Sequence, residues 1–425
     1  MDSTNQLIFI CGLLLCAAIF ASFLSRRIGA PLLVTFLGVG ILFGEDGPGG
    51  IVFNDVPLSY LACSFALAVI LYDGGIHTPM KNFRQALRPA VLLSSAGVLV
   101  TTSIVALGMW WFLGTDPLYA LLFGSLVAAT DAAAVFLLLR QQGIKLKPMV
   151  ANTLEVESGI NDPMAIFLAL TFTGLILAGG FDGMEGGVWS VPVGFVQQFG
   201  IGAALGIAGG RLLTFFYDRV ALELGLNPIF ALASGLLIFG AANILGGSGF
   251  LAVYLAGLIL GNHAYRAKQV VKQFMDGMAW LAQLAMLLIL GLLVTPSKLI
   301  ADIPEALLIS AILIFAARPA AVFISLAFEG FSWREKLFMS WVGLRGAIPI
   351  YLAIIPVLLG VPGNFFNIAF LVVLVSLVLQ STTVGIVGRL LKIGEVAAPE
   401  TAEPGPLRRR PPDCQPGRTR LSLNG

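Results

Sequence analysis

The sequence predicts an all-α polytopic membrane protein with thirteen transmembrane helices arranged as inverted repeats. Hydrophobic residues make up 58% of the chain and charged residues only 11%, whereas soluble domains contain about 25% charged residues. Apolar spans of membrane-crossing length follow one another along most of the sequence, and Lys and Arg gather in alternate loops between them. These three observations favour a membrane protein over a soluble domain.

Thirteen apolar spans are evident and are numbered here in chain order. Most approach the ~20 residues that a helix needs to cross a bilayer, while spans 2 and 9 are short. Their approximate limits are 6–25, 30–44, 57–73, 90–114, 118–139, 150–178, 190–213, 228–245, 249–262, 274–294, 303–328, 336–359 and 364–388.

The basic residues set the predicted orientation, because cytoplasmic loops carry an excess of Lys and Arg. One set of alternate loops is basic throughout, from Arg26 and Arg27 near the start to Arg389 and Lys392 near the end. The opposite set contains Lys298 and mostly acidic residues. We therefore expect the N-terminus outside and the C-terminus in the cytoplasm.

Spans seven apart share features, which indicates two inverted halves with span 7 as the connector. Spans 2 and 9 each carry glycines four residues apart, a spacing that lets helices approach closely. Spans 5 and 12 each have a polar, breaker-rich centre, at Thr130–Asp131 and at Gly343–Pro349. We therefore expect helices 5 and 12 to be discontinuous.

Span 6 carries three carboxylates, Glu155, Glu157 and Asp162, within eight residues. Each charge near the bilayer centre costs roughly 2.5–3.5 kcal/mol, so the cluster favours the handling of ions or protons. On a helix, Ser158 and Asp162 share a face because they are four residues apart. Glu155 lies on nearly the same stripe, two turns closer to the cytoplasm, and Glu157 forms a second stripe with Asn161.

Pro163 follows this cluster directly. Because proline donates no backbone N–H, the carbonyl of Gly159 is left without its usual partner. Together with Asp162 and the Ser158 hydroxyl, that carbonyl suits a hard monovalent cation. The alternative interpretation is that Pro163 only kinks the helix.

Two further charges lie in the middle of apolar spans. Asp131, in a run of small residues in span 5, either binds the cation or caps a broken half-helix. Arg345 in span 12 needs a partner. Glu157 is the best candidate for that partner, because Asp162 must be free to change its charge.

Two other charged residues give weaker signals. Arg318, which precedes a proline in span 11, is similar in kind to Arg345. Asp73 lies at the inner end of span 3. It is either an acid at the entrance to the site or an ordinary interfacial residue.

These segments resemble the monovalent cation/proton antiporter family, CPA1, and most closely its NhaP2-type potassium/proton antiporters. The similarity covers about residues 1–393. The segments that carry it are Thr130-Asp131, Glu157-Ser158-Gly-Ile-Asn161-Asp162-Pro163 and Gly-Leu-Arg345-Gly-Ala, with Leu-Tyr-Asp73-Gly-Gly and Leu-Glu155-Val-Glu157-Ser typical of the NhaP2 type.

The resemblance implies a sodium/proton antiporter fold, usually dimeric, over residues 1–393. A core of spans 4–6 and 11–13 moves against a dimerisation scaffold of spans 1–3 and 7–10. The residues expected to hold the cation are Thr130, Asp131, Ser158 and Asp162. Those expected to stabilise the crossing of the broken helices are Glu157, Asn161 and Arg345. Glu155 and Asp73 are supporting candidates because of their positions in spans 6 and 3.

Residues 394–425 differ from the rest of the chain. From Ala397 onward they are rich in Pro and Arg, including Arg408–Arg410, and such a composition does not bury a core. We expect a disordered cytoplasmic tail. It either touches anionic membrane lipid or has no task of its own.

We therefore expect a secondary active antiporter that exchanges a monovalent cation for a proton in the bacterial inner membrane, for cation and pH homeostasis. The subfamily resemblance favours K⁺, with Na⁺ as the alternative. No Gly-x-x-x-x-Gly-Lys-Ser/Thr loop is present, and no Cys or His spacing is typical of zinc or haem. We expect no enzyme activity, no cofactor and no nucleic-acid partner. The alternative from another class is a cation channel, which needs a continuous pore.

The sequence also predicts the stoichiometry. Asn161 precedes Asp162, so the central pair of span 6 has one ionisable member. In family relatives with two acids at these positions, the second acid is linked to electrogenic exchange. If Glu157 and Asp131 stay charged throughout the cycle, one cation should exchange for one proton.

Overall fold

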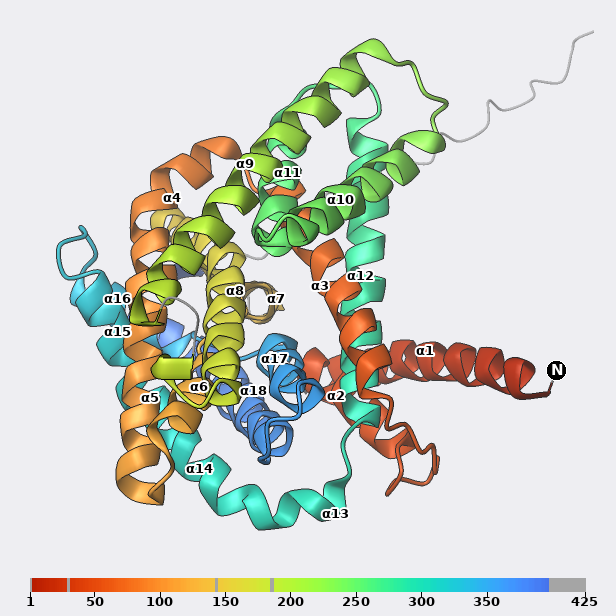
Figure 1. Ribbon diagram of the computed structural model, residues 1–425. Coiled ribbons are helices and arrows are strands. Elements are labelled where there is room, and N and C mark those ends of the chain that lie inside the picture. Colours follow the sequence, from red (N-terminus) through yellow and green to blue (C-terminus); the bar gives the residue numbers. More distant parts are fainter. Residues whose placement is uncertain (1, 29–30, 142–143, 184–186, 397–425) are drawn as a thin grey trace, which may run out of the picture.

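The computed structural model describes residues 2–28, 31–141, 144–183 and 187–396, and it is almost entirely helical (Figure 1). Several of the predicted spans are single helices, and others are interrupted. The α-helices are α1 (Asp2–Ile28), α2 (Leu32–Phe43), α3 (Val56–His77), α4 (Met80–Leu92), α5 (Val98–Leu113), α6 (Pro117–Leu126), α7 (Ala132–Gln141), α8 (Pro148–Leu177), α9 (Ser190–Arg219), α10 (Leu226–Ile244), α11 (Gly249–Asn262), α12 (Lys268–Leu292), α13 (Pro296–Leu299), α14 (Ile303–Ile312), α15 (Arg318–Ser325), α16 (Trp333–Trp341), α17 (Ala347–Leu358) and α18 (Phe365–Leu390).

Within the described ranges, nine helical segments are long and apolar enough to cross a membrane, counted by length and composition. Four shorter apolar helices, α2, α6, α11 and α17, have 10–17 residues. Every span predicted from the sequence coincides with one of these segments or with an interrupted pair of helices. The count of thirteen crossings itself stays a prediction.

The predicted breaks in spans 5 and 12 are confirmed. Helix α6 ends at Leu126 and α7 begins at Ala132, and helix α16 ends at Trp341 and α17 begins at Ala347. The two non-helical stretches meet, because the Asp131 backbone N–H donates to the Leu344 carbonyl oxygen at 2.8 Å. Two interrupted helices therefore cross inside the molecule, with α8 packed against α6 and α17.

A second pair of irregularities follows the same seven-span offset. The helix from α4 to α5 contains a π-helical segment, η1 (Leu93–Gly97), and the helix from α14 to α15 contains another, η5 (Leu313–Ala317). π-Helical segments are rare in proteins, and those that occur are often found at functional sites. Spans 4 and 11 thus share a π-helical segment that the sequence did not predict. This likeness supports the arrangement of the chain as two inverted halves.

Glycines set the helix contacts that the small-residue spacing predicted. A methyl group on Gly257 of α11 would collide with the Tyr72 carbonyl oxygen of α3. A methyl group on Gly40 of α2 would lie only 2.6 Å from the Leu288 carbonyl oxygen of α12. The pairs α3–α11 and α2–α12 are related by the seven-span offset, and in both the backbones approach closely.

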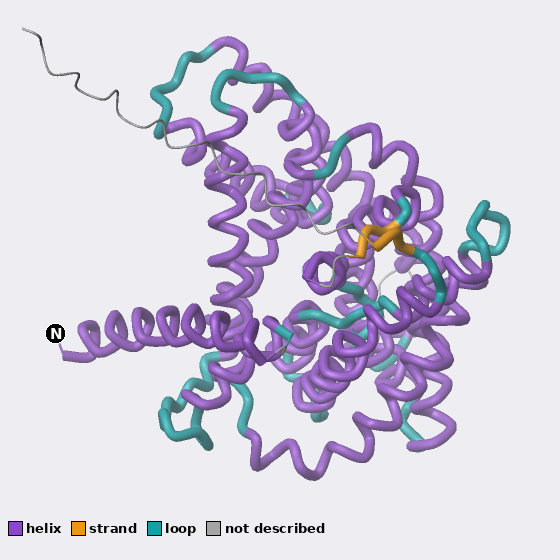
Figure 2. The backbone as a smooth tube through the Cα atoms, turned by 180° about the vertical axis from the view of Figure 1, so that it is seen from behind, coloured by secondary structure: helices purple, strands orange, loops and turns teal. Residues whose placement is uncertain are grey.

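The short elements complete the description. Three 3₁₀ turns are η2 (Phe181–Gly183), η3 (Gly187–Trp189) and η4 (Ile300–Asp302). Strands β1 (Ile144–Leu146) and β2 (Gly394–Val396) pair antiparallel, with Lys145 opposite Glu395 (Figure 2). The expected disordered tail began at residue 394, and for residues 394–396 this is wrong because their backbone pairs with β1. The rest of that tail, 397–425, lies outside the described residues.

Gly257→Ala should lower the melting temperature of the purified protein in detergent, because the added methyl group has no room beside α3. The matched control is Gly240→Ala in α10, where nothing lies within 4 Å of the added methyl group. There the change should be neutral or stabilising, since Ala favours a helix over Gly by roughly 0.5–1 kcal/mol. Equal melting shifts for the two variants would contradict the close packing of α3 and α11.

Candidate functional site

Arg345 holds the crossing of the two broken helices together. Its side chain is 1% exposed, and its Nη1 donates to the carbonyl oxygens of Ala128 and Ala129, both at 2.8 Å. These carbonyls follow the end of α6, where the helix dipole is negative and backbone acceptors lack helical partners. The guanidinium therefore satisfies and neutralises the end of a half-helix inside the molecule.

Asp131 neutralises the N-terminal end of a half-helix, as Arg345 neutralises a C-terminal end. Its Oδ1 accepts a hydrogen bond from the Ala134 backbone N–H at 3.1 Å, so Asp131 caps the positive N-terminus of α7. Its carboxylate also lies against Gly346, the residue before α17, where a methyl group would collide with it. Of the two roles that the sequence left open for Asp131, helix capping is present in the geometry, and cation binding stays a prediction.

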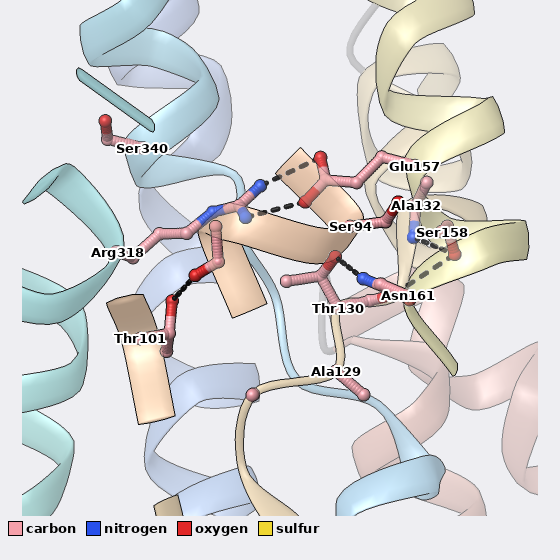
Figure 3. A network of polar contacts seen from close by, with 12 residues as sticks. Ser94, Thr101, Ala129, Thr130, Ala132, Glu157, Ser158, Asn161, Arg318 and Ser340 are labelled. Carbon is pink, nitrogen blue, oxygen red and sulfur yellow. Dashed lines mark hydrogen bonds and ion pairs between the residues drawn. The ribbon is translucent and has the colours of Figure 1, made fainter. Parts of the chain in front are cut away.

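Three of the predicted site residues join α8 to the break between α6 and α7 (Figure 3). The Ser158 hydroxyl donates to the Thr130 carbonyl oxygen at 3.1 Å and accepts from the Ala132 N–H at 3.4 Å. The Asn161 Nδ2 donates to the Thr130 hydroxyl at 2.6 Å. The structure therefore brings these residues of spans 5 and 6 together, and their part in cation binding stays a prediction.

Asp162 stands apart from this network. Its side chain is 2% exposed, and its Oδ1 has no hydrogen-bond partner among the described residues. Asp131 lies close enough for the two negative charges to repel each other. Helix α8 runs through Pro163 without ending. A buried carboxylate without a compensating partner is costly, and a proton or a cation bound to it removes that cost.

The predicted pairing of Glu157 with Arg345 is wrong. Glu157 instead accepts two hydrogen bonds from Arg318, to Oε1 at 2.6 Å and to Oε2 at 3.1 Å, in a buried bidentate ion pair (Figure 3). Arg345 is directed to the Ala128 and Ala129 carbonyls because the broken helix offers it backbone acceptors. Arg318 was visible in the sequence as a second intramembrane cation, but its position beside α8 depends on how α15 packs.

Two supporting candidates lie away from this network. Glu155 accepts a hydrogen bond from the Thr78 hydroxyl at 2.9 Å. Asp73 pairs with His77, one turn further along α3, with 3.1 Å between its Oδ1 and the imidazole Nδ1. Asp73 is 15% exposed and His77 is 42% exposed. No contact in the described structure joins Asp73 to Asp162.

Sequence reasoning missed the polar residues of α18. The Arg345 backbone N–H donates to the Ser376 hydroxyl at 3.0 Å, and that hydroxyl donates to Gln380 at 2.5 Å. Gln380 in turn donates to the Trp341 carbonyl at the end of α16, at 2.7 Å. Span 13 corresponds to span 6 in the seven-span offset. Its polar residues could therefore have been recognised in the sequence as candidates for this role. Ser376 supports the second break much as Ser158 supports the first.

Comparison with known proteins agrees with this geometry. A family model described as the transmembrane part of sodium/hydrogen exchangers matches residues 13–390. The K⁺/H⁺ antiporter NhaP of Alkalimonas amylolytica is 44% identical over 395 residues, which are 92% of this chain and 68% of that protein. The K⁺/H⁺ antiporter NhaP2 of Shewanella oneidensis is 45% identical with the same coverage. The Na⁺/H⁺ antiporter ApNhaP of Aphanothece halophytica is 28% identical over 394 residues, 88% of this chain and 72% of that protein.

The fold is also that of a solved structure. The sodium/proton antiporter MjNhaP1 from Methanocaldococcus jannaschii, determined at pH 8, superposes with a TM-score of 0.78. The match covers 93% of this chain and 100% of that one, with 23% sequence identity. At this identity the likeness concerns the fold.

Breaking the Glu157–Arg318 pair should destabilise the protein by about 3–5 kcal/mol in either single variant, Glu157→Gln or Arg318→Ala, because each leaves an opposite charge buried. The double variant should lose less than the sum of the two. Chemical unfolding in detergent gives these free energies.

The control for this cycle is the pair between His263 and Asp218, which are 34% and 53% exposed. Asp218→Asn should change stability by only about 0–1 kcal/mol. Strictly additive losses for Glu157 and Arg318, or a stronger coupling of Glu157 to Arg345, would contradict the pairing.

Proposed function

The chain belongs to the sodium/hydrogen exchanger family and is a secondary transporter that exchanges a monovalent cation for a proton; from this premise we propose that Asp162 carries the two loads in turn. The observation that supports the proposal is the buried Asp162 carboxylate, whose Oδ1 has no hydrogen-bond partner in the described chain. The family and the fold favour this exchange over the cation channel considered as the alternative.

Coupling follows from competition for this one carboxylate. A bare negative charge is expensive to move through an apolar barrier. A proton or a monovalent cation each neutralises Asp162, so only the loaded site crosses at low cost. Because both loads cannot occupy the carboxylate together, the movement of one in one direction requires the movement of the other in the opposite direction.

The remaining cation ligands in this proposal are oxygen atoms next to Asp162. Ser158 and Thr130 supply hydroxyl and carbonyl oxygens that already lie within hydrogen-bond distance of each other. Asp131 adds a second carboxylate that interacts with Asp162. Oxygen ligands of this kind suit hard monovalent cations. Asn161 positions Thr130 through the hydrogen bond to its hydroxyl.

We further propose that a core of α4–α8 and α14–α18 moves as a unit against a scaffold of α1–α3 and α9–α12, in a homodimer. The internal ties of the core support this division. Glu157–Arg318 links α8 to α15, and Arg345 links the α16–α17 break to the end of α6. Both ties are buried and charged, so the helices that they join resist separation.

The proposed setting is the bacterial inner membrane, with the N-terminus outside and the C-terminus in the cytoplasm. The support for this orientation is the alternation of basic loops along the sequence. We propose K⁺ as the transported cation, because the relatives with 44% and 45% identity are named K⁺/H⁺ antiporters. Proton flux in vesicles driven by Li⁺, Na⁺, K⁺ or Rb⁺ tests this choice, and a clear preference for Na⁺ would overturn it.

Asp162→Asn should abolish exchange and leave a folded, inserted protein, because Asn keeps the shape of the side chain and removes its titrating charge. Cation-dependent proton flux in reconstituted vesicles measures the loss, and the elution profile in detergent checks the fold. Asp116→Asn, at the exposed N-cap of α6, is a control that should exchange normally. Cation-dependent proton flux retained by the Asp162 variant would contradict the proposed competition for this carboxylate.

Exchange should be electroneutral, one cation for one proton, because Asp162 is the one group whose load changes in the proposed cycle. Glu157 stays ionised with Arg318, and Asp131 stays ionised at the start of α7. An imposed membrane potential should then leave the rate unchanged. A current under a cation gradient would contradict the stoichiometry and leave the antiporter assignment standing.

A further inference from the structure

We propose that Glu155, Thr78 and Tyr254 form a loading subsite for the transported cation, one step before Asp162 on the path from the cytoplasm. This inference rests on the proposed function and adds a second position to it. The geometry points to it through three observations: a stripe of oxygen-bearing side chains on α8, an unpaired buried hydroxyl, and the place of the cluster between the two proposed bodies.

The stripe on α8 runs from Glu155 through Ser158 to Asp162. These residues are three and four positions apart, so they lie on one face of the helix. The distance along the axis from the first to the last is about 10 Å. Glu155 and Ser158 are partly exposed, whereas Asp162 is buried. A cation that leaves water at Glu155 therefore meets an oxygen atom at each turn before it reaches Asp162.

The side chains around Glu155 are suited to hold a cation. The Thr78 hydroxyl lies 2.9 Å from Glu155 Oε1. Tyr254 is 2% exposed, and its hydroxyl has no hydrogen-bond partner in the described part of the chain. The Tyr254 ring lies against Gly159, four residues along α8 from Glu155, so the tyrosine lies on the face of α8 that carries this carboxylate. An unpaired buried hydroxyl beside a carboxylate is a polar group that a bound ion would satisfy.

The Tyr254 hydroxyl is held in place by the packing of its ring. The ring lies against Gly159 of α8, where a methyl group would come within 2.6 Å of the ring carbons. The ring also contacts Phe83, with 6.4 Å between the ring centroids. The ring needs the space that Gly159 leaves, and in our proposal its hydroxyl faces Glu155 and Thr78.

The subsite takes its ligands from both proposed bodies. Glu155 belongs to α8 of the core, Thr78 follows α3, and Tyr254 belongs to α11 of the scaffold. A shift of the core against the scaffold would therefore move Glu155 relative to Thr78 and Tyr254. A cation bound among them favours this arrangement over any in which the core has shifted. Transfer to Asp162 then removes that preference and frees the core to move.

The chemistry selects the ligand class. One carboxylate and two hydroxyls are hard oxygen ligands, which suit a hard metal cation such as the transported monovalent ion. No cysteine or histidine takes part, so the set does not suit a soft transition metal. The expected occupant is the transported cation itself, and the probe for the experiments is K⁺.

The test compares exchange in inside-out and right-side-out vesicles. Glu155→Gln keeps the shape of the side chain and one oxygen that can accept from Thr78, and it removes the charge. The KM for K⁺ presented to the cytoplasmic face should rise roughly tenfold, the effect of losing one charged ligand, with kcat nearly unchanged. The KM for K⁺ at the opposite face should stay the same, which a general structural defect would not produce.

Two milder variants keep the proposal testable if Glu155→Gln folds poorly. Tyr254→Phe retains the ring on Gly159 and removes only the hydroxyl, and Thr78→Val retains the shape and removes the donor. Both should raise the same KM, by less than Glu155→Gln does. The control is Glu223→Gln, which removes an exposed charge from a loop on the same predicted face and should leave KM unchanged.

The outcomes separate the two proposals. If the unaltered protein exchanges K⁺ and none of the three variants raises the cytoplasmic KM, the subsite is overturned and the proposed function stands. A rise at both faces, or a loss of kcat at constant KM, also overturns it, because neither is expected from a one-sided loading site. If the unaltered protein exchanges no cation for protons, the proposed function fails first.

Discussion

Charge placed at broken helix ends is the constraint on which the rest of the structure depends. Two helices stop inside an apolar environment, and each stop leaves backbone groups that no water can satisfy. Arg345 meets the free carbonyls after α6, Asp131 meets the free N–H groups at the start of α7, and Gln380 meets the end of α16. The two helix breaks can lie inside the molecule because these side chains satisfy backbone groups that the breaks leave free.

The different roles of the acids Glu157, Asp131 and Asp162 follow from that constraint. Glu157 is bound by Arg318 on both of its oxygens, and Asp131 is engaged with a helix end. Asp162 interacts with Asp131, yet its Oδ1 has no partner among the described residues. Two of the acids are thus already engaged, and one carboxylate is still available to a ligand.

Much of this arrangement could be predicted from the sequence, because a charge or a helix breaker in an apolar span is a strong local signal. The breaks at Thr130 and Arg345 and the polar stripes of α8 were all expected on that ground. The partner of Glu157 was not, because two arginines were available and only tertiary packing decides which of them reaches it. The π segments η1 and η5 could not be predicted either, because their sequences are compatible with an ordinary α-helix.

The shortness of α11 has a consequence for the permeability barrier. With 14 residues, α11 is about 21 Å long, whereas the hydrocarbon core of a bilayer is ~30 Å thick. It packs against α3, α9 and α10, and its last residue, Asn262, donates a hydrogen bond to the Thr78 carbonyl oxygen at 2.9 Å. The apolar length that α11 contributes to the barrier is therefore shorter than the hydrocarbon core of the surrounding lipid.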